Sequence, residues 1–442
     1  LEDSPARHRL RAELFAKKKF RYEALPFDSR PIKEKRRLRV GYFSADFQDH
    51  PVTHLIIRAL ELHNREDFEV YAYSLGVDNH VGGARKRLMR AVDVFKDVSK
   101  LNVIDINLLA REDGIDIAID LTGYTRGSGT GIFAYRAAPI QINYLGFPGT
   151  MGADFMDYMV VDDVVVPDEQ REHYSEKLIR LPHAYIATDN TREVPSAVPS
   201  RVEMGLPGEG FVFCAFNNSY KITPREFDIW MRLLNQVEGS VLWLRGCHKT
   251  AEQNLRRESQ SRGVDSSRLI FAERVSASEH LARHQLADLF LDTFIFNAHS
   301  TAVDALWAGL PVVTKLGEGF AARVAGSLLT SLGMPELVVS TESAYEALAL
   351  DLAMNPDRLA KVKQTLSENV LTQPLFDSEQ YTKHLESGYR QAYQRYLDGQ
   401  DPADIRVEKI LNKNPLKWGP SKNPSKEQLE KLLDFFNRGQ FQ

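Results

Sequence analysis

The chain has 442 residues, of which 43% are hydrophobic and 26% charged, and its formal net charge is −4. This length exceeds what one hydrophobic core organises and predicts two or three soluble globular domains. The acidic balance gives no electrostatic case for nucleic acid as a partner, and two cysteines exclude a disulfide scaffold and a cysteine-based zinc site. No apolar run approaches a membrane span and no signal peptide is visible, so the expected location is cytoplasmic.

The first half of the chain alternates the patterns of strands and helices. This order predicts a parallel sheet with helices on both faces. Pro51 favours a helix start because its ring fixes the backbone angle of the first turn. In chain order the predicted elements are a basic helix and linker at 1–36, strands at 37–47 and 68–75, helices at 51–63, 84–92 and 103–112, and strands at 115–124, 139–152 and 156–167.

The second half repeats this alternation of strands and helices. It follows a polar, Pro-rich stretch at 182–207, which is the predicted hinge. The chain therefore predicts two doubly wound α/β domains with a ligand cleft between them. In order the elements are strands at 211–217, 240–246, 268–273, 287–293, 311–314 and 336–340, and helices at 223–237, 251–262, 278–285, 301–309 and 320–332, with further helices to about 396.

The stretch from 287 to 316 is the most informative for function. It reads as strand, polar turn, helix and strand, and the turn lies at the carboxyl end of the first strand, where open α/β sheets bind ligands. His299, Ser300 and Thr301 occupy the start of the helix, whose free N–H groups favour a diphosphate. Asp304, one turn further, is placed to meet a ribose hydroxyl. The alternative is a polar cap on an ordinary helix.

The chemistry of a departing diphosphate needs a metal ion or fixed positive groups. No D-x-D motif stands at a strand end, and the adjacent pair Asp162 and Asp163 reads as structural. Lys221, just past the strand at 211–217, is the best candidate cation. His50 and His54 share a helix face, as zinc ligands can, but the sequence offers no third ligand. We therefore expect no metal and no cofactor.

Several segments together resemble one family. They are VGYFSADFQDHPVTHL, GYTRG, APIQINYLGFPGTMGADFMDY, YSEKLIRLPH, FNNSYKITP, SVLWLRG, ASEHLARHQLADLFLDT and HSTAVDALWAGLPVVT. They look like the catalytic region of the O-linked N-acetylglucosamine transferases of protein Ser/Thr, as a bacterial-type homologue. This family also holds SPINDLY-type O-fucosyltransferases and bacterial adhesin N-glucosyltransferases. The resemblance runs in order from Arg37 to about Tyr396.

The resemblance implies a GT-B fold, in which two Rossmann-like domains face a cleft, and an inverting, metal-independent enzyme that moves N-acetylglucosamine from UDP-GlcNAc to protein or peptide acceptors. The implied domains are a linker at 1–36, lobes at 37–195 and 196–375, a returning helix at 376–400 and a tail at 401–442. The tail predicts a linker and the start of a tetratricopeptide repeat, with an array of such repeats following.

The resemblance also implies roles for individual residues. His50 is a candidate catalytic base, with a donor phosphate oxygen as the alternative, and Lys221 contacts the diphosphate. The donor-binding residues by this resemblance are Leu145, Gly146 and Pro148 on the sugar side, Asn218 near the phosphates, His280 and Arg283 in the nucleotide pocket, and His299, Ser300, Thr301 and Asp304 at the helix.

Three departures leave the donor open. Asn218-Ser219 resembles the SPINDLY branch, Ala277 stands where the acetylglucosaminyl enzymes carry Lys, and the loop at Gly129 lacks an Arg. UDP-glucose or GDP-fucose is the alternative donor. A non-catalytic repeat scaffold is the alternative outside enzymes, and a sugar-nucleotide epimerase of the same fold is a more distant one.

Overall fold

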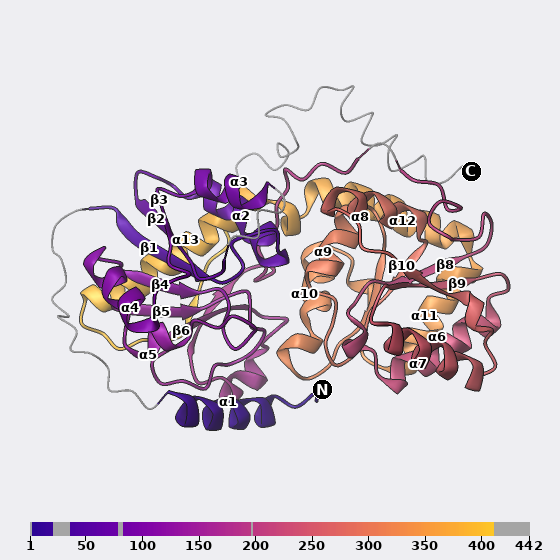
Figure 1. Cartoon of the computed structure of the whole chain (residues 1–442), viewed down its shortest axis with the longest axis horizontal. Coiled ribbons are helices and arrows are strands. Elements are labelled where there is room, and N and C mark those ends of the chain that lie inside the picture. The colour runs from indigo at the N-terminus through magenta and orange to yellow at the C-terminus, as the bar shows by residue number, and fades with distance from the viewer. Residues whose placement is uncertain (1, 21–35, 78–82, 196–197, 411–442) are drawn as a thin grey trace. The chain divides into compact units, whose positions relative to one another are not determined.

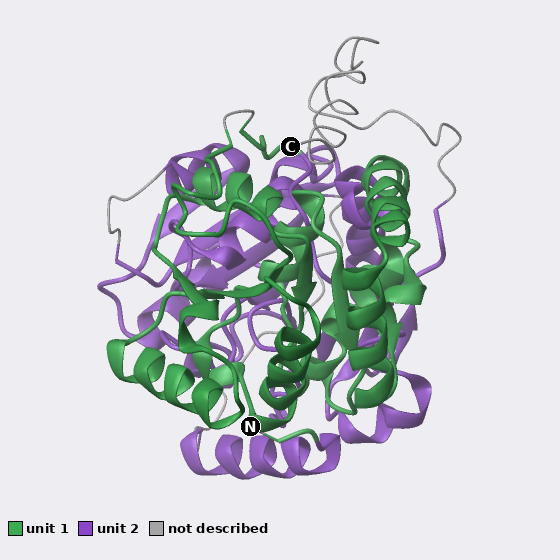
Figure 2. Ribbon diagram, turned by 90° about the vertical axis from the view of Figure 1, so that its right-hand side faces the viewer, with its two compact units in different colours: residues 1–3, 191–373, 414–442 green, residues 4–190, 374–413 purple. Residues whose placement is uncertain are grey.

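The structure, a computed structural model, describes residues 2–20, 36–77, 83–195 and 198–410. The chain divides into two compact units (Figures 1 and 2). Unit 1 holds Leu1–Asp3 and Thr191–Gln373, and unit 2 holds Ser4–Asn190 and Pro374–Lys413. The chain thus changes unit after Asn190 and after Gln373, where the sequence placed the changes at 195 and 375. The predicted repeat at the C-terminus lies outside the described residues.

Unit 2 is built on a parallel sheet in the order β3-β2-β1-β4-β5-β6-β7-β14. The strand order reverses between β1 and β4, as in a Rossmann sheet. Its elements are α1 (Pro5–Lys19), β1 (Leu38–Ser44), α2 (Pro51–Leu62), β2 (Phe68–Ser74), α3 (Ala84–Ala91), β3 (Val94–Asp97), α4 (Val103–Glu112), β4 (Ile117–Asp120), α5 (Gly131–Ala134), β5 (Ile140–Asn143), β6 (Tyr158–Asp162), β7 (Lys177–Leu181), α13 (Ser378–Leu397) and β14 (Ile405–Arg406).

Unit 1 is built on a second parallel sheet in the order β10-β9-β8-β11-β12-β13. Here the order reverses between β8 and β11, which makes the carboxyl ends of these two strands the expected ligand position. Its elements are β8 (Val212–Ala215), α6 (Pro224–Gln236), β9 (Val241–Arg245), α7 (Lys249–Ser261), β10 (Leu269–Ala272), α8 (Ala277–Arg283), β11 (Leu289–Leu291), α9 (Ser300–Trp307), β12 (Val312–Lys315), α10 (Val324–Ser331), β13 (Val338–Val339), α11 (Glu342–Met354) and α12 (Pro356–Thr372).

The two doubly wound α/β sheets confirm the predicted fold class, and local signals explain the elements. All residues of β8 and β11 are buried, as expected for strands covered by helices on both faces. Thr223 and Glu226 form a capping box at α6, where Pro224 begins the helix. The helix at α8 begins earlier than predicted, because Ser276 rather than Ser278 caps it in a second capping box with Glu279.

Unit 2 is completed by the return of the chain. Thr188 donates a hydrogen bond from its hydroxyl to the Leu375 carbonyl oxygen at 2.9 Å, and the Ser378 hydroxyl donates to the Thr188 carbonyl oxygen at 2.8 Å. The chain therefore leaves unit 2 and re-enters it at neighbouring positions. The yellow helix α13 then lies among the indigo and purple elements of the first half (Figure 1), and β14 pairs with β7.

Within the described part of the chain, no helix combines the length and the apolar character needed to cross a bilayer. Three strands of unit 2, β3, β7 and β14, lie where the sequence predicted none. The residues of β3 are half-buried or exposed because this strand forms the edge of its sheet, so it lacks the apolar run of a central strand.

Candidate functional site

Lys221 lies beside the carboxyl end of β8, in the one-turn helix Ser219–Lys221. It is buried, with 7% of the residue exposed. Its ammonium donates a hydrogen bond to the Asn297 carbonyl oxygen at 2.7 Å and lies 4.1 Å from the centroid of the Phe296 ring. Burial lowers the pKa of Lys221 to about 8, although the Asp292 carboxylate opposes this shift. The cation therefore lies at the turn that leads into α9.

Asp292 follows β11 and is fully buried. Its carboxylate accepts hydrogen bonds from the N–H groups of Thr293 and Ala298, at 2.8 and 2.6 Å, and from the Thr314 hydroxyl at 2.7 Å. Burial raises the pKa of Asp292 to about 6, against these hydrogen bonds and the Lys221 charge. This carboxylate fixes the turn that carries Asn297. The sequence analysis missed it, although an acidic residue directly after a buried strand was a usable signal.

His299 is the N-cap residue of α9, but its side chain does not cap the helix. The Nε2 atom lies 3.2 Å from the Ala321 carbonyl oxygen, and the ring stacks on Phe296 at a centroid distance of 4.8 Å. Burial and the Lys221 charge lower the pKa of His299 to about 3, so the ring is neutral at neutral pH. Ser300 and Thr301, both half-buried, form the first turn. Lys221 and the start of α9 thus share one corner of unit 1.

The predicted nucleotide-pocket residues lie on α8. Arg283 donates a hydrogen bond from Nε to the His280 Nδ1 atom at 3.0 Å, and its guanidinium lies 4.7 Å from the centroid of the Phe216 ring. The His280 ring lies 5.4 Å from the same Phe216 ring. Burial lowers the pKa of His280 to about 2, which keeps it uncharged. An aromatic and cationic wall of this kind suits a flat heterocycle.

Asp304 on α9 has a cationic partner. Its carboxylate forms an ion pair with Arg192, with an Nη1–Oδ1 distance of 2.6 Å. The Trp307 indole N–H, on the same helix, donates to the Arg192 carbonyl oxygen at 3.1 Å. The sequence predicted the carboxylate for a ribose hydroxyl and did not find its cationic partner.

Asn218, predicted near the phosphates, is exposed and caps the short helix that carries Lys221. Its side-chain oxygen accepts a hydrogen bond from the Arg245 guanidinium, and its backbone carbonyl accepts one from the Lys221 N–H at 2.9 Å. Arg245 ends β9, so two cationic side chains approach the carboxyl edge of the sheet near this loop.

His50 belongs to unit 2, where it precedes α2 at the carboxyl end of β1. Its Nδ1 atom accepts a hydrogen bond from the Val52 N–H at 3.3 Å and lies 3.6 Å from an Asp46 carboxylate oxygen. Burial lowers the pKa of His50, while the Asp46 charge acts in the opposite direction. The ring is therefore neutral near pH 7 with its hydrogen on Nε2, and Nδ1 is the atom that can accept a proton. His54 pairs with Asp49 at 2.6 Å rather than with His50.

The predicted sugar-side loop follows β5 and is held in an unusual backbone conformation. Leu145 has a φ of 68°, which is rare for a residue with a side chain. A Cβ atom at Gly146 would lie 1.9 Å from the Leu121 carbonyl oxygen, so only glycine fits there. Pro148 follows, half-buried. Such local strain is typical of functional loops.

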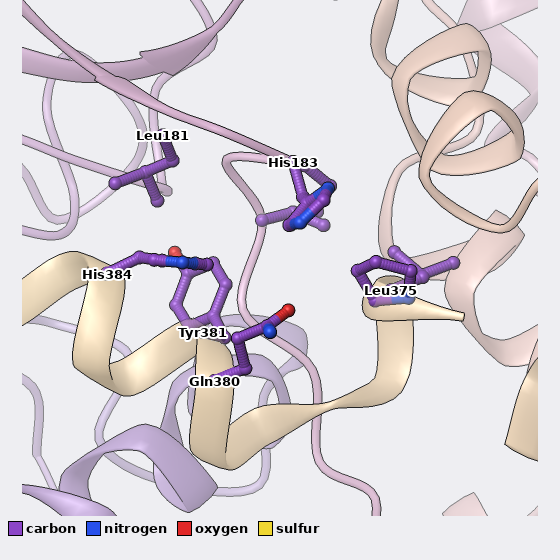
Figure 3. Close-up of a pocket in the computed structure, with 9 residues that line it drawn as sticks. Leu181, His183, Leu375, Gln380, Tyr381 and His384 are labelled. Atoms are coloured by element: carbon purple, nitrogen blue, oxygen red, sulfur yellow. The ribbon is translucent and has the colours of Figure 1, made fainter. Parts of the chain in front are cut away.

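Unit 2 also contains a small pocket away from these residues (Figure 3). His183 and His384 line it, with a ring centroid distance of 5.8 Å, together with Gln380 and Tyr381 of α13. Its volume of about 10 Å³ has room for roughly one water molecule. The pocket therefore cannot hold a nucleotide.

The predicted residues thus fall into two groups. Unit 1 brings together the turn before α9, the cation after β8 and the aromatic wall on α8. Unit 2 carries His50 and the loop at 145–148, at the carboxyl ends of β1 and β5. Each group lies at or next to the point where its sheet reverses strand order. The cleft between the two domains stays a prediction.

Comparison with known proteins identifies the family of this chain. The sequence model of glycosyl transferase family 41 matches residues 11–196 and 190–385. The chain belongs to this family. A solved O-GlcNAc transferase of Thermobaculum terrenum, in a mutant form, is 30% identical to this family 41 chain with a TM-score of 0.80, over 90% of this chain and 75% of the other. The GT-B fold class expected from the sequence is therefore confirmed.

Two curated members of the family extend the comparison. The probable UDP-N-acetylglucosamine–peptide N-acetylglucosaminyltransferase SEC of Arabidopsis thaliana is 38% identical, over 85% of this chain and 39% of its own length. The UDP-N-acetylglucosamine–peptide N-acetylglucosaminyltransferase of Caenorhabditis elegans is 30% identical, over 83% of this chain and 42% of its own length. The family 41 chain described here thus spans about two fifths of each of these relatives.

Proposed function

We propose that this family 41 chain transfers N-acetylglucosamine from UDP-GlcNAc to Ser and Thr hydroxyls of proteins, with inversion at the anomeric carbon. The relatives' names support this donor and a peptide acceptor. The observation that carries the proposal is the position of the buried Lys221 ammonium, 2.7 Å from the Asn297 carbonyl oxygen at the turn into α9. A diphosphate at the start of this helix would meet both a cation and free backbone N–H groups.

The proposed reaction is a single displacement. The acceptor oxygen attacks the anomeric carbon, the bond from this carbon to the diphosphate oxygen breaks, and UDP departs. Lys221 and the first turn of α9, with Ser300 and Thr301, stabilise the charge that develops on the departing diphosphate. His50 takes the acceptor proton, for which a neutral ring with a lowered pKa is suited.

The remaining residues bind the donor in this proposal. His280 and Arg283, which pack on the buried Phe216 ring, contact the nucleobase, Asp304 accepts from a ribose hydroxyl, and Asn218 lies beside the phosphates. Leu145, Gly146 and Pro148 shape the sugar side. We further propose a cytoplasmic location.

The test is transfer from labelled UDP-GlcNAc to proteins of a cell lysate. We expect label on polypeptides and release of UDP, and we expect Lys221→Ala to reduce the rate about 100-fold or more because one charge-stabilising donor is lost. Lys363→Ala is the matched control, since Lys363 pairs with Asp288 elsewhere in unit 1 and should leave the rate unchanged. Absence of any transfer by the unmodified chain would contradict the proposal. Calorimetric titration with UDP and GDP separates it from a GDP-fucose donor.

A further inference from the structure

Arg192 contacts α9 through both its side chain and its backbone. Its side chain pairs with Asp304 at 2.6 Å, and its carbonyl oxygen accepts from the Trp307 indole at 3.1 Å. The paired side chains are largely shielded, with 14% of Arg192 and 18% of Asp304 exposed. Asp304 and Trp307 lie one turn apart on the helix, so a residue close to the start of unit 1 is held along the α9 surface.

The Arg192 guanidinium also lies near the two histidines of the α8 region. Its positive charge contributes to the lowered pKa of both His280 and His284, after the larger effect of burial. The Asp304 charge acts on His284 in the opposite direction. The guanidinium thus pairs with Asp304 and acts electrostatically on His280 and His284, and the proposed function assigns Asp304 and His280 to the nucleoside.

His284 shows that this region has an unused polar group. The ring is fully buried, and its Nδ1 atom lies 2.6 Å from the His280 carbonyl oxygen, which places the proton on Nδ1. The Nε2 lone pair has no hydrogen-bond partner in the described part of the chain. A buried acceptor without a partner is uncommon in folded proteins.

We infer that Arg192 occupies the nucleoside part of the donor site in the ligand-free protein, that ribose hydroxyls displace it from Asp304, and that it thereby sets a preference for nucleotides over nucleosides. This inference rests on the proposed function. The carboxylate that pairs with a guanidinium cannot also accept fully from a ribose. Once displaced, the guanidinium is a cation beside a bound diphosphate, to which arginine binds well.

The consequence is a difference between UDP and uridine. Uridine has to break the Arg192–Asp304 pair without compensation, whereas UDP gives the released guanidinium a new anionic partner. In Arg192→Gln we expect uridine to bind about three- to tenfold more tightly, because the free energy of a partly shielded ion pair corresponds to about this change in affinity. We expect UDP to bind with the wild-type affinity or more weakly. The ratio of the two dissociation constants should therefore fall.

The experiment is calorimetric titration of the full chain and its variants with UDP and with uridine. Arg201→Gln is the matched control, because Arg201 pairs with Asp288 at 2.9 Å in the same unit with 23% and 20% of the side chains exposed. The control should keep the wild-type ratio. A melting curve of each variant checks folding, and Arg192→Lys, which keeps the charge, should retain the preference for UDP.

An Arg192→Gln variant whose ratio stays at the wild-type value would overturn the inference, since Arg192 would then serve only the structure of α9. A Lys variant that loses the preference as fully as the Gln variant would overturn the electrostatic explanation. If the wild-type chain binds neither ligand, the proposed function fails with it. If the wild-type chain binds UDP and transfers the sugar, but Arg192→Gln leaves the ratio of the UDP and uridine dissociation constants unchanged, the inference fails and the proposed function stands.

Discussion

The Lys221 ammonium donates a hydrogen bond to the Asn297 carbonyl oxygen at 2.7 Å and so joins the loops that follow β8 and β11. These strands are neighbours across the point where the sheet of unit 1 reverses its order. An ammonium carries three donors, so this bond leaves two for a ligand.

The transfer rate should depend on the protonation of Lys221. Its pKa of about 8 means that the ammonium dominates at lower pH and is lost as the pH rises through this value. We expect kcat/KM to fall by about tenfold per pH unit above that point, because the neutral amine cannot stabilise the departing diphosphate. Initial rates between about pH 6 and pH 10 measure this fall, which is the alkaline limb of the pH–rate profile. A flat profile up to pH 10 would show that the lysine charge is not needed.

Substitution of Asp292 should move the same limb. The carboxylate raises the pKa of Lys221, so Asp292→Asn should lower that pKa and shift the alkaline limb to lower pH. Asparagine keeps the shape of the side chain and an acceptor for the N–H groups of Thr293 and Ala298, so we expect the variant to fold. Asp228→Asn, at an exposed pair with Arg262, is the control and should leave the limb in place. An unshifted limb in a folded Asp292→Asn variant counts against the coupling.

His50→Ala should separate catalysis from donor binding. We expect kcat to fall by about 10²- to 10⁴-fold, the usual contribution of a general base, with unchanged affinity for UDP. In the unmodified protein, burial lowers the pKa of His50, so the neutral base persists below pH 6.5 and is lost as the pH falls through the lowered pKa. The acidic limb of kcat/KM should thus lie below pH 6.5.

His54→Ala provides the comparison, because His54 lies on α2, one turn from His50, and pairs with Asp49 before the helix. Its effect on kcat should be small. Full activity of His50→Ala would instead support the donor phosphate oxygen as the base.

The loop after β5 should tolerate substitution of Gly149 but not of Gly146. Gly146→Ala places a Cβ atom 1.9 Å from the Leu121 carbonyl oxygen, whereas the nearest atom to a Cβ at Gly149 is 3.7 Å away. We expect Gly146→Ala to lower the free energy of unfolding by about 2–4 kcal/mol and to reduce transfer, because the loop has to move. Gly149→Ala should change both little. Denaturant unfolding and initial rates test the pair, and equal effects of the two substitutions would contradict the steric explanation.

The sequence predicted the frame of unit 1 well because its signals are local. The buried strands on both sides of the switch point, the Thr223 cap and the turn before α9 are each encoded within a few residues. The same holds for the starts of α2 and α4. The start of α8 was predicted at 278 and lies at Ala277, although Ser276 and Glu279 have capping-box spacing, a local signal that was available.

The missed features depend on contacts between distant segments. Arg192 and Asp304 are 112 positions apart, and nothing around Arg192 marks it as a partner of α9. Strand β7 begins with an exposed lysine and gains its place only by pairing with β6 and β14. The identities of such partners follow from the tertiary fold, which is why the pattern of residues alone does not reveal them.

The exit and return of the chain at adjacent points of unit 2 make unit 1 an insertion. Because Thr188 and Leu375 are hydrogen-bonded neighbours, a short peptide joining Asn190 to Pro374 would span the gap left by removal of Thr191–Gln373. During synthesis, the sheet of unit 2 stays without α13 until residues up to 397 have left the ribosome, whereas the inserted segment is complete once residue 373 has emerged. The inserted segment can therefore fold first, and a nascent chain whose residues up to about 375 have left the ribosome would carry a finished insert within an unfinished host.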